Sequence, residues 1–164
     1  GIDECEWLAD PSLVGPIFER VRGLLPQELR GGGVAGVNPR FRLFRYGQGA
    51  VYRPHIDGSW PGGGLDAETG QWVTNDALRS RLTFLVYLND GFEGGATTFY
   101  VPSKACEGEM DAYGVDPQAG AVLCFPQGNT ASLVHEGSAV REGTKYVIRT
   151  DVLYAMPTPA AGRG

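Results

Sequence analysis

The sequence predicts one mainly β domain of the sandwich or jelly-roll type, with a helical segment near its start. Short stretches rich in β-branched and aromatic residues alternate with Gly, Pro, Asn and Asp after residue 33, which is typical of short strands and turns. The 25 glycines suit many tight turns. At 164 residues the chain can bury an ordinary single core, and its strands do not alternate with helices as in βαβ folds.

The helical segment follows Asp10 and Pro11, which suit an N-cap and a first helical turn. Pro16 falls inside the segment and is expected to split or kink it. Pro26 and the three glycines at 31–33 should end it. The apolar residues recur at helical spacing, at Leu13, Val14, Ile17, Phe18, Val21, Leu24 and Leu25.

Seven strands are predicted after the helix, at residues 40–46, 51–55, 82–88, 97–101, 121–125, 132–135 and 145–153. Residues 58–80 form a long connection with Trp60 and Trp72, and we expect either a loop that closes over substrate or an exposed insertion. We expect a single domain over residues 1–156, with its core barrel at about 37–154. Residues 157–164 should form a flexible tail.

Composition narrows the class of partner. The net charge of −5 argues against nucleic acid, and no apolar run approaches a membrane span. The first ten residues have no apolar core of a signal peptide; the compartment stays open, with cytoplasm or nucleus favoured. Cys5, Cys106 and Cys124 lack metal-type spacing and are expected to be buried or incidental thiols, with a disulfide between two of them left open. The oligomeric state is not predicted.

The chain has two histidines, His55 and His135. In an extended segment His55 and Asp57 point to the same side, so they can bind one ion. Two imidazoles and one carboxylate form the ligand set that holds Fe(II) in non-haem oxygenases. Lys145 and Arg149 share one face of the last strand. Lys145 could hold the distal carboxylate of a keto-acid co-substrate, or could be a solvent-exposed lysine at a strand end.

Three blocks of sequence occur in a set order. They are R-L-F-R-Y-G-Q-G-A-V-Y-R-P-H-I-D-G-S at 42–59; L-T-F-L-V-Y-L-N-D at 82–90 with F-E-G-G-A-T-T-F at 92–99; and G-A-V-L-C-F-P at 120–126 with H-E-G at 135–137 and G-T-K-Y-V-I-R-T-D-V-L-Y at 143–154. In content, order and spacing these blocks resemble the prolyl 4-hydroxylase-like branch of the 2-oxoglutarate/Fe(II) oxygenases. The resemblance covers about residues 37–154.

The resemblance implies a double-stranded β-helix, which is a jelly roll with the metal at one open end, flanked by one or two N-terminal helices. It also implies that this chain begins within the family's usual domain, so that part of the N-terminal flank is missing. The catalytic iron ligands would be His55, Asp57 and His135.

The resemblance further implies a 2-oxoglutarate pocket. Lys145 would pair with the distal carboxylate, and Tyr46 and Tyr87 would line the pocket. Arg149 is open among three roles: orienting 2-oxoglutarate, contacting substrate, or pairing with Asp151 or another buried acid. The cofactors would be Fe(II), 2-oxoglutarate and O2, with ascorbate left open as an accessory reductant.

The implied activity is a dioxygenase that hydroxylates an unactivated carbon, with peptidyl proline as the natural substrate, and releases succinate and CO2. Other peptidyl residues, free amino acids and small molecules stay open, because the fold does not fix the substrate. One alternative is a cupin-type dioxygenase without 2-oxoglutarate, although such sites usually have more histidine ligands. Another is a jelly-roll metal-binding module without turnover. A serine hydrolase fits poorly, because no G-x-S-x-G motif is present.

Overall fold

The computed structural model describes residues 1–66, 68–128 and 133–157. The largest of its sheets has eight strands. In this sheet the long strand β7 (Trp72–Tyr87) pairs with β14 (Lys145–Ala155), with β11 (Val122–Pro126) and with β6 (Pro61–Leu65). The order of neighbouring strands through β14 is β1 (Ile2–Leu8), β4 (Arg40–Tyr46), β14, β3 (Gly32–Val37) and β2 (Glu28–Leu29).

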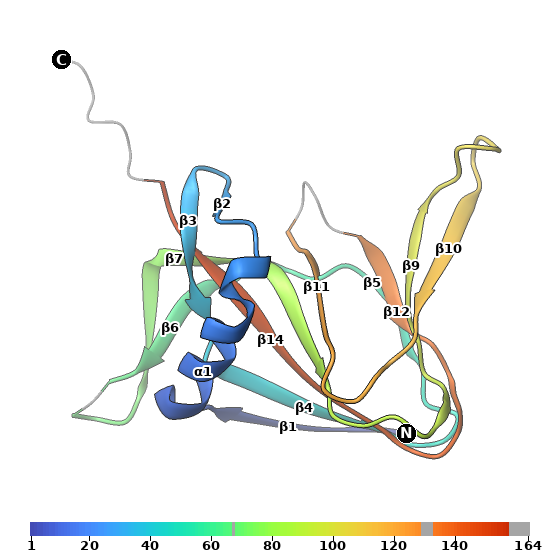
Figure 1. The fold of residues 1–164 in the computed structure, drawn as a ribbon, viewed down its shortest axis with the longest axis horizontal. Coiled ribbons are helices and arrows are strands. Elements are labelled where there is room, and N and C mark those ends of the chain that lie inside the picture. The colour runs from blue at the N-terminus through green and yellow to red at the C-terminus, as the bar shows by residue number, and fades with distance from the viewer. Residues whose placement is uncertain (67, 129–132, 158–164) are drawn as a thin grey trace.

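A second, 4-stranded sheet lies beside the first (Figure 1), and this two-sheet arrangement is the predicted jelly roll. Two of its strands, β9 and β10, form a hairpin that extends away from the body of the domain (Figure 1). Its order is β10 (Met110–Val115), β9 (Thr97–Pro102), β12 (Val134–Gly137) and β5 (Tyr52–His55). A small pair is made by β13 (Val140–Glu142) and β8 (Glu93–Gly94).

The helix α1 (Pro11–Val21) begins as predicted, because Asp10 caps it by accepting a hydrogen bond from the Ser12 backbone N–H at 2.8 Å. The prediction that Pro16 splits or kinks the helix is wrong for the split, because the helix is continuous from Pro11 to Val21, and the kink stays a prediction. Pro16 removes one backbone hydrogen bond within an eleven-residue helix, and packing of the apolar side keeps the rest in place. A short 3-10 turn, η1 (Arg22–Leu24), continues the chain.

Two apolar clusters stabilise the domain, one on each face of the larger sheet. The helix packs its apolar stripe on the outer cluster, and Figure 1 shows α1 lying across this face. The inner cluster faces the second sheet and includes residues of β4, β7 and β14. The outer cluster contains Phe41, Leu82, Phe84, Val152 and Tyr154 against Val14, Ile17, Phe18 and Val21, and the inner one contains Phe44, Tyr46, Tyr87, Val140 and Val147.

The prediction of a long connection at residues 58–80 is wrong, because β6 and the first half of β7 pair there as a β-hairpin. Glycines of β6 leave room for its partner: a Cβ on Gly62 would lie 2.7 Å from the Leu78 Cβ, and one on Gly63 would overlap the Trp72 ring. A glycine-rich strand has the sequence pattern of a turn, so its pairing is not visible locally. Whether this hairpin moves with substrate stays a prediction.

The seven predicted strands are present, and β1, β2, β3, β6, β8, β10 and β13 are additional. The predicted strand at 132–135 is observed as β12, while Ser132 lies outside the described residues, as does the predicted tail beyond Pro157. Cys5, Cys106 and Cys124 are free, so no disulfide joins them. Within the described ranges, no helix has the length and apolar character to cross a bilayer.

Candidate active site

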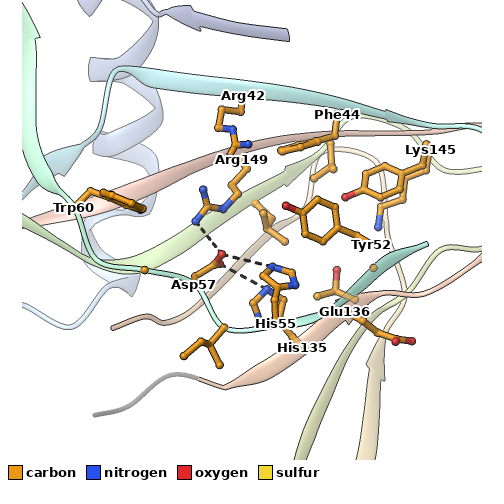
Figure 2. Close-up of a pocket in the computed structure, with 17 residues that line it drawn as sticks. Arg42, Phe44, Tyr52, His55, Asp57, Trp60, His135, Glu136, Lys145 and Arg149 are labelled. Atoms are coloured by element: carbon orange, nitrogen blue, oxygen red, sulfur yellow. Dashed lines mark ion pairs between the residues drawn. The ribbon is translucent and has the colours of Figure 1, made fainter. Parts of the chain in front are cut away.

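The pairing of β5 with β12 places the two histidines side by side. His55 and His135 are direct partners in the register, and their ring centroids are 4.3 Å apart. Asp57 follows two residues after His55 and points to the same space (Figure 2). The three side chains each offer a ligand atom, and these atoms all lie within 4.8 Å of one another.

Each imidazole is oriented by a backbone carbonyl. The Nδ1 atom of His55 lies 2.8 Å from the Arg53 carbonyl oxygen, and the Nδ1 atom of His135 lies 2.9 Å from that of Leu133. Because a carbonyl only accepts, each Nδ1 carries the proton and each Nε2 keeps its lone pair. The Nε2 atoms lie 3.7 Å and 3.6 Å from the Asp57 oxygens, so both lone pairs are available beside the carboxylate.

The charge on Asp57 is stabilised despite its burial. Burial alone would raise the pKa of this carboxyl, but the contact with His55, the Arg149 charge and the hydrogen bond from Thr83 together hold the pKa well below its usual range. The contact with Asp57 raises the pKa of His55, whereas burial lowers that of His135. A charged carboxylate and neutral imidazoles are the forms that bind a divalent cation.

Arg149, on β14, pairs with buried acids. Its Nη2 atom lies 3.0 Å from the Asp57 Oδ1 atom and 3.8 Å from the Asp151 Oδ1 atom. Of the three roles left open by the sequence, pairing with acids is therefore the one seen in the structure. Arg149 also lines the cavity above the histidines, as Figure 2 shows.

A cavity of about 240 Å³ separates the two sheets next to this cluster. Lys145 lies in its wall with only 2% of its surface exposed, and its ammonium donates to the Gly95 carbonyl at 2.7 Å. Burial lowers the pKa of Lys145 to about 8. No described carboxylate lies within ion-pair distance of it, so the cavity presents a buried cation that an anionic ligand would neutralise.

The predicted tyrosines differ in position. Tyr46 lines the cavity, and Lys145 Nζ lies 5.1 Å from its ring centroid; burial raises its pKa, which keeps the phenol a donor. Tyr87 is fully buried behind Lys145, and its hydroxyl lies 2.8 Å from Thr97 Oγ1. Tyr87 is thus not a lining residue of the cavity, whereas Thr97 is.

Sequence reasoning gave no role to Tyr52, whose ring centroid lies 4.7 Å from that of His55. Strand alternation from His55 would put a residue three positions earlier on the opposite face. An irregular register between His135 and Gly137, the partner of Tyr52, brings the ring into the cavity instead. The nearby motif Y-x-x-H was the only available signal.

A second cavity, of about 470 Å³, adjoins the first and shares Arg42, Trp60 and Arg149 with it. Its wall includes Trp72 and Thr74 from the β6–β7 hairpin. The two cavities therefore share part of one wall, and the second lies next to the cavity that holds the histidines and the buried lysine.

A jelly roll that gathers two imidazoles and one carboxylate at one cavity defines a class of protein, the non-haem iron enzymes with a facial ligand set. Comparison with known families is more specific. A sequence model of the 2OG-Fe(II) oxygenase superfamily matches residues 41–150, and the chain belongs to that superfamily. Its cofactors are therefore Fe(II) and 2-oxoglutarate. The nitrogen and oxygen donors fit the metal, and Lys145, which has no acidic partner among the described residues, fits a carboxylate.

Solved structures share the fold. The viral collagen prolyl hydroxylase from Paramecium Bursaria Chlorella virus-1, in complex with 2OG, has a TM-score of 0.59 at 19% identity, over 94% of this chain and 80% of that one. A prolyl hydroxylase from Trichoplax adhaerens, in complex with a hypoxia inducible factor oxygen degradation domain peptide fragment, has a TM-score of 0.59 at 17% identity, over 95% and 63%. No curated protein sequence matches the chain significantly.

Proposed function

We propose that this chain is a 2-oxoglutarate- and Fe(II)-dependent dioxygenase that hydroxylates a prolyl residue within a polypeptide. One observation carries the proposal. A buried ammonium without an acidic partner in the described chain and a His–Asp–His cluster line the same cavity. A ligand that chelates iron at one end and carries a carboxylate at the other matches both features, and 2-oxoglutarate is such a ligand.

In this proposal His55, Asp57 and His135 hold the iron through two nitrogens and one carboxylate oxygen. When bound, the iron and 2-oxoglutarate supply the O2-derived oxidant that hydroxylates a C–H bond, with succinate and CO2 as coproducts. Lys145 binds the distal carboxylate by a charge-assisted hydrogen bond. The Tyr46 hydroxyl, beside Lys145, donates a hydrogen bond to the same carboxylate. The surrounding inner cluster excludes water from this end of the cavity.

The second cavity supports a polypeptide as substrate, because it adjoins the metal site and adds about 470 Å³ of lined space beside it, more than the first cavity itself offers. Its two tryptophans are partly exposed, Trp60 by 56% and Trp72 by 37%. Each ring packs against a glycine, since a Cβ on Gly58 would lie 3.2 Å from Trp60 Cζ2 and one on Gly63 would overlap Trp72. Rings held in this way offer flat apolar surfaces to prolyl rings.

Hydrogen-bond donors complement these rings. Arg40, Arg42 and Asn38 line the same cavity, and the two arginines pair with Glu6 and Glu4 at partly exposed positions. A proline-rich segment has carbonyl acceptors but few N–H donors, so a wall of donors and aromatic rings suits it. The Trichoplax relative was solved with a peptide, which agrees with this class of substrate.

The proposal is tested by succinate release with Fe(II), 2-oxoglutarate and a panel of proline peptides, free proline and small molecules. We expect succinate formation to rise with a proline peptide and the peptide to gain one oxygen atom. The variant Trp72→Ala should raise the peptide KM about threefold to tenfold, the range of one aromatic contact. Tyr113→Ala is the matched control, because Tyr113 is 58% exposed but lies on β10, outside both cavities.

Two outcomes would contradict the proposal. Oxygen incorporation into free amino acids or small molecules, with no peptide modified, would replace the substrate class and leave the reaction type. Failure of His135→Ala to reduce succinate release would instead remove the metal assignment.

A further inference from the structure

A chain of buried polar side chains lies behind Asp57. Ser80 and Thr83 of β7 have no exposed surface, and Gln127, just after β11, has 1%. The Thr83 hydroxyl donates to Asp57 Oδ2 at 2.6 Å, and the Gln127 amide nitrogen donates to the Thr83 oxygen at 3.0 Å. Burying a polar group costs free energy unless the group has a hydrogen-bond partner. Here each buried side chain bonds to the next one in the chain.

The direction of every bond in this chain is determined. The Trp60 backbone N–H donates to the Ser80 oxygen at 2.8 Å, so the single Ser80 proton is available to the Gln127 carbonyl oxygen that it contacts. The amide nitrogen of Gln127 also lies 2.9 Å from Asp151 Oδ1, so the reverse orientation of the amide would place two acceptors together. Gln127 therefore offers N–H, not C=O, to Thr83.

The consequence falls on Thr83. A threonine hydroxyl has one proton, and its oxygen already accepts from Gln127. The proton must therefore point to Asp57, where it binds Oδ2, while Arg149 binds Oδ1 at 3.0 Å. A donor on each oxygen stops the carboxylate from rotating, and the sides facing the two imidazoles stay open to a cation.

We infer that Thr83 and Gln127 are positioning residues for the metal ligand Asp57. Gln127 touches no proposed ligand, yet it sets the direction of the hydroxyl that does. This inference rests on the proposed role of Asp57 as a ligand and goes beyond it. Because the chain of bonds begins at the backbone of Trp60, whose side chain lines both cavities, it also ties the cavity wall to the metal ligand.

The test measures binding of Mn(II) alone to the metal-free protein by isothermal titration calorimetry, with no substrate or 2-oxoglutarate present. Thr83→Val keeps the shape and removes the hydroxyl, and we expect it to weaken Mn(II) binding about tenfold to a hundredfold, as is typical for partners of metal ligands. Thr83→Ser restores a hydroxyl and should return the affinity to within about threefold of wild type. Gln127→Met should weaken binding in the same direction as Thr83→Val.

The matched control is Thr150→Val. The Thr150 hydroxyl is equally buried and donates to the Asn38 carbonyl at 2.6 Å, away from Asp57. It should lower thermal stability by as much as Thr83→Val does, with wild-type Mn(II) affinity. Equal loss of affinity in both variants would mean general loosening of the barrel and would overturn the inference.

Asp57→Ala, measured in parallel, separates the two levels of the proposal. Wild-type Mn(II) affinity in Asp57→Ala would remove the ligand assignment, and with it the proposed function. Lost affinity in Asp57→Ala together with wild-type affinity in Thr83→Val would overturn only the positioning role. If Gln127→Met does not fold, Thr83→Val and Thr83→Ser still decide the outcome.

Discussion

Binding of 2-oxoglutarate should weaken as the pH rises through 8, because Lys145 must be charged to pair with the distal carboxylate. Burial lowers the pKa of Lys145 from 10.5 to about 8 in the free protein. The lysine is then about nine-tenths charged at pH 7 and about one-tenth charged at pH 9, so the Kd for 2-oxoglutarate should rise about tenfold between them. Calorimetric titration of the Mn(II)-loaded protein across this range measures the change.

The same lysine should destabilise the free protein. Because burial lowers its pKa from 10.5 to about 8, the ammonium is less favourable in the folded state by about 3 kcal/mol at pH 7. This cost disappears as the pH rises from 8 towards 10.5. Loss of the bond to Gly95 offsets about 1 kcal/mol. Lys145→Met should therefore be more stable than wild type by about 2 kcal/mol in thermal unfolding at pH 7.

Two variants test this reasoning. Lys145→Met should weaken 2-oxoglutarate binding about tenfold to a hundredfold, because a charged hydrogen bond contributes about 1.5–3 kcal/mol. Lys145→Arg stays charged throughout the range, so its 2-oxoglutarate affinity should not depend on pH. A Kd that is flat from pH 7 to 9 in wild type would refute the lowered pKa of Lys145, and unchanged affinity in Lys145→Met would refute the pairing. Unchanged affinity in Lys145→Met, with loss in Arg149→Met, would transfer the role to Arg149.

Further predictions concern stability and metal. Gly94→Ala should destabilise the protein by more than 1 kcal/mol in denaturant unfolding. The reason is that Gly94 has φ +76° and an added Cβ would overlap the Ala139 carbonyl oxygen. A variant as stable as wild type would contradict this. Phe84→Ala, at a side chain with no exposed surface, should cost about 3–5 kcal/mol, and a loss below about 1 kcal/mol would show that the outer cluster collapses around the gap. Asp10→Ala should lower the Tm through the lost helix cap, and Asp10→Ser should restore it. Chelation of metal should lower the Tm of the loaded protein, and an unchanged Tm would argue against binding by the native state.

Much of the fold follows from local pattern. The predicted strand at residues 40–46 coincides with β4, and the last strand begins at Lys145 as predicted, because both have alternating apolar side chains and clear breakers before them. The strand β1 was not predicted, since its acidic residues are unfavourable in a strand taken alone. Its pairing with the arginines of β4, such as Arg42 with Glu4 at 2.6 Å, stabilises it. Such compensation between distant segments cannot be read from one segment.

Part of the candidate site also follows from local pattern, and part depends on contacts between distant segments. The spacing of His55 and Asp57 shows that both point to one side, and alternation places Lys145 and Arg149 on one face. The network through Thr83 and Gln127 is not visible in the sequence, because its side-chain bonds join the strand β7 to residues that follow the ends of β5 and β11. A buried glutamine has no periodicity of its own, and only the fold shows which acceptors it meets.

The direct pairing of His55 with His135 has a consequence for folding. The two residues are 135 − 55 = 80 positions apart, so the metal cluster cannot form until a long-range strand contact has closed. A slip of β12 by one residue would turn the His135 imidazole to the opposite face and leave the cation with two ligands at most. Tight Mn(II) binding during refolding would therefore report molecules with the native register, and the cation would select them from compact misaligned states.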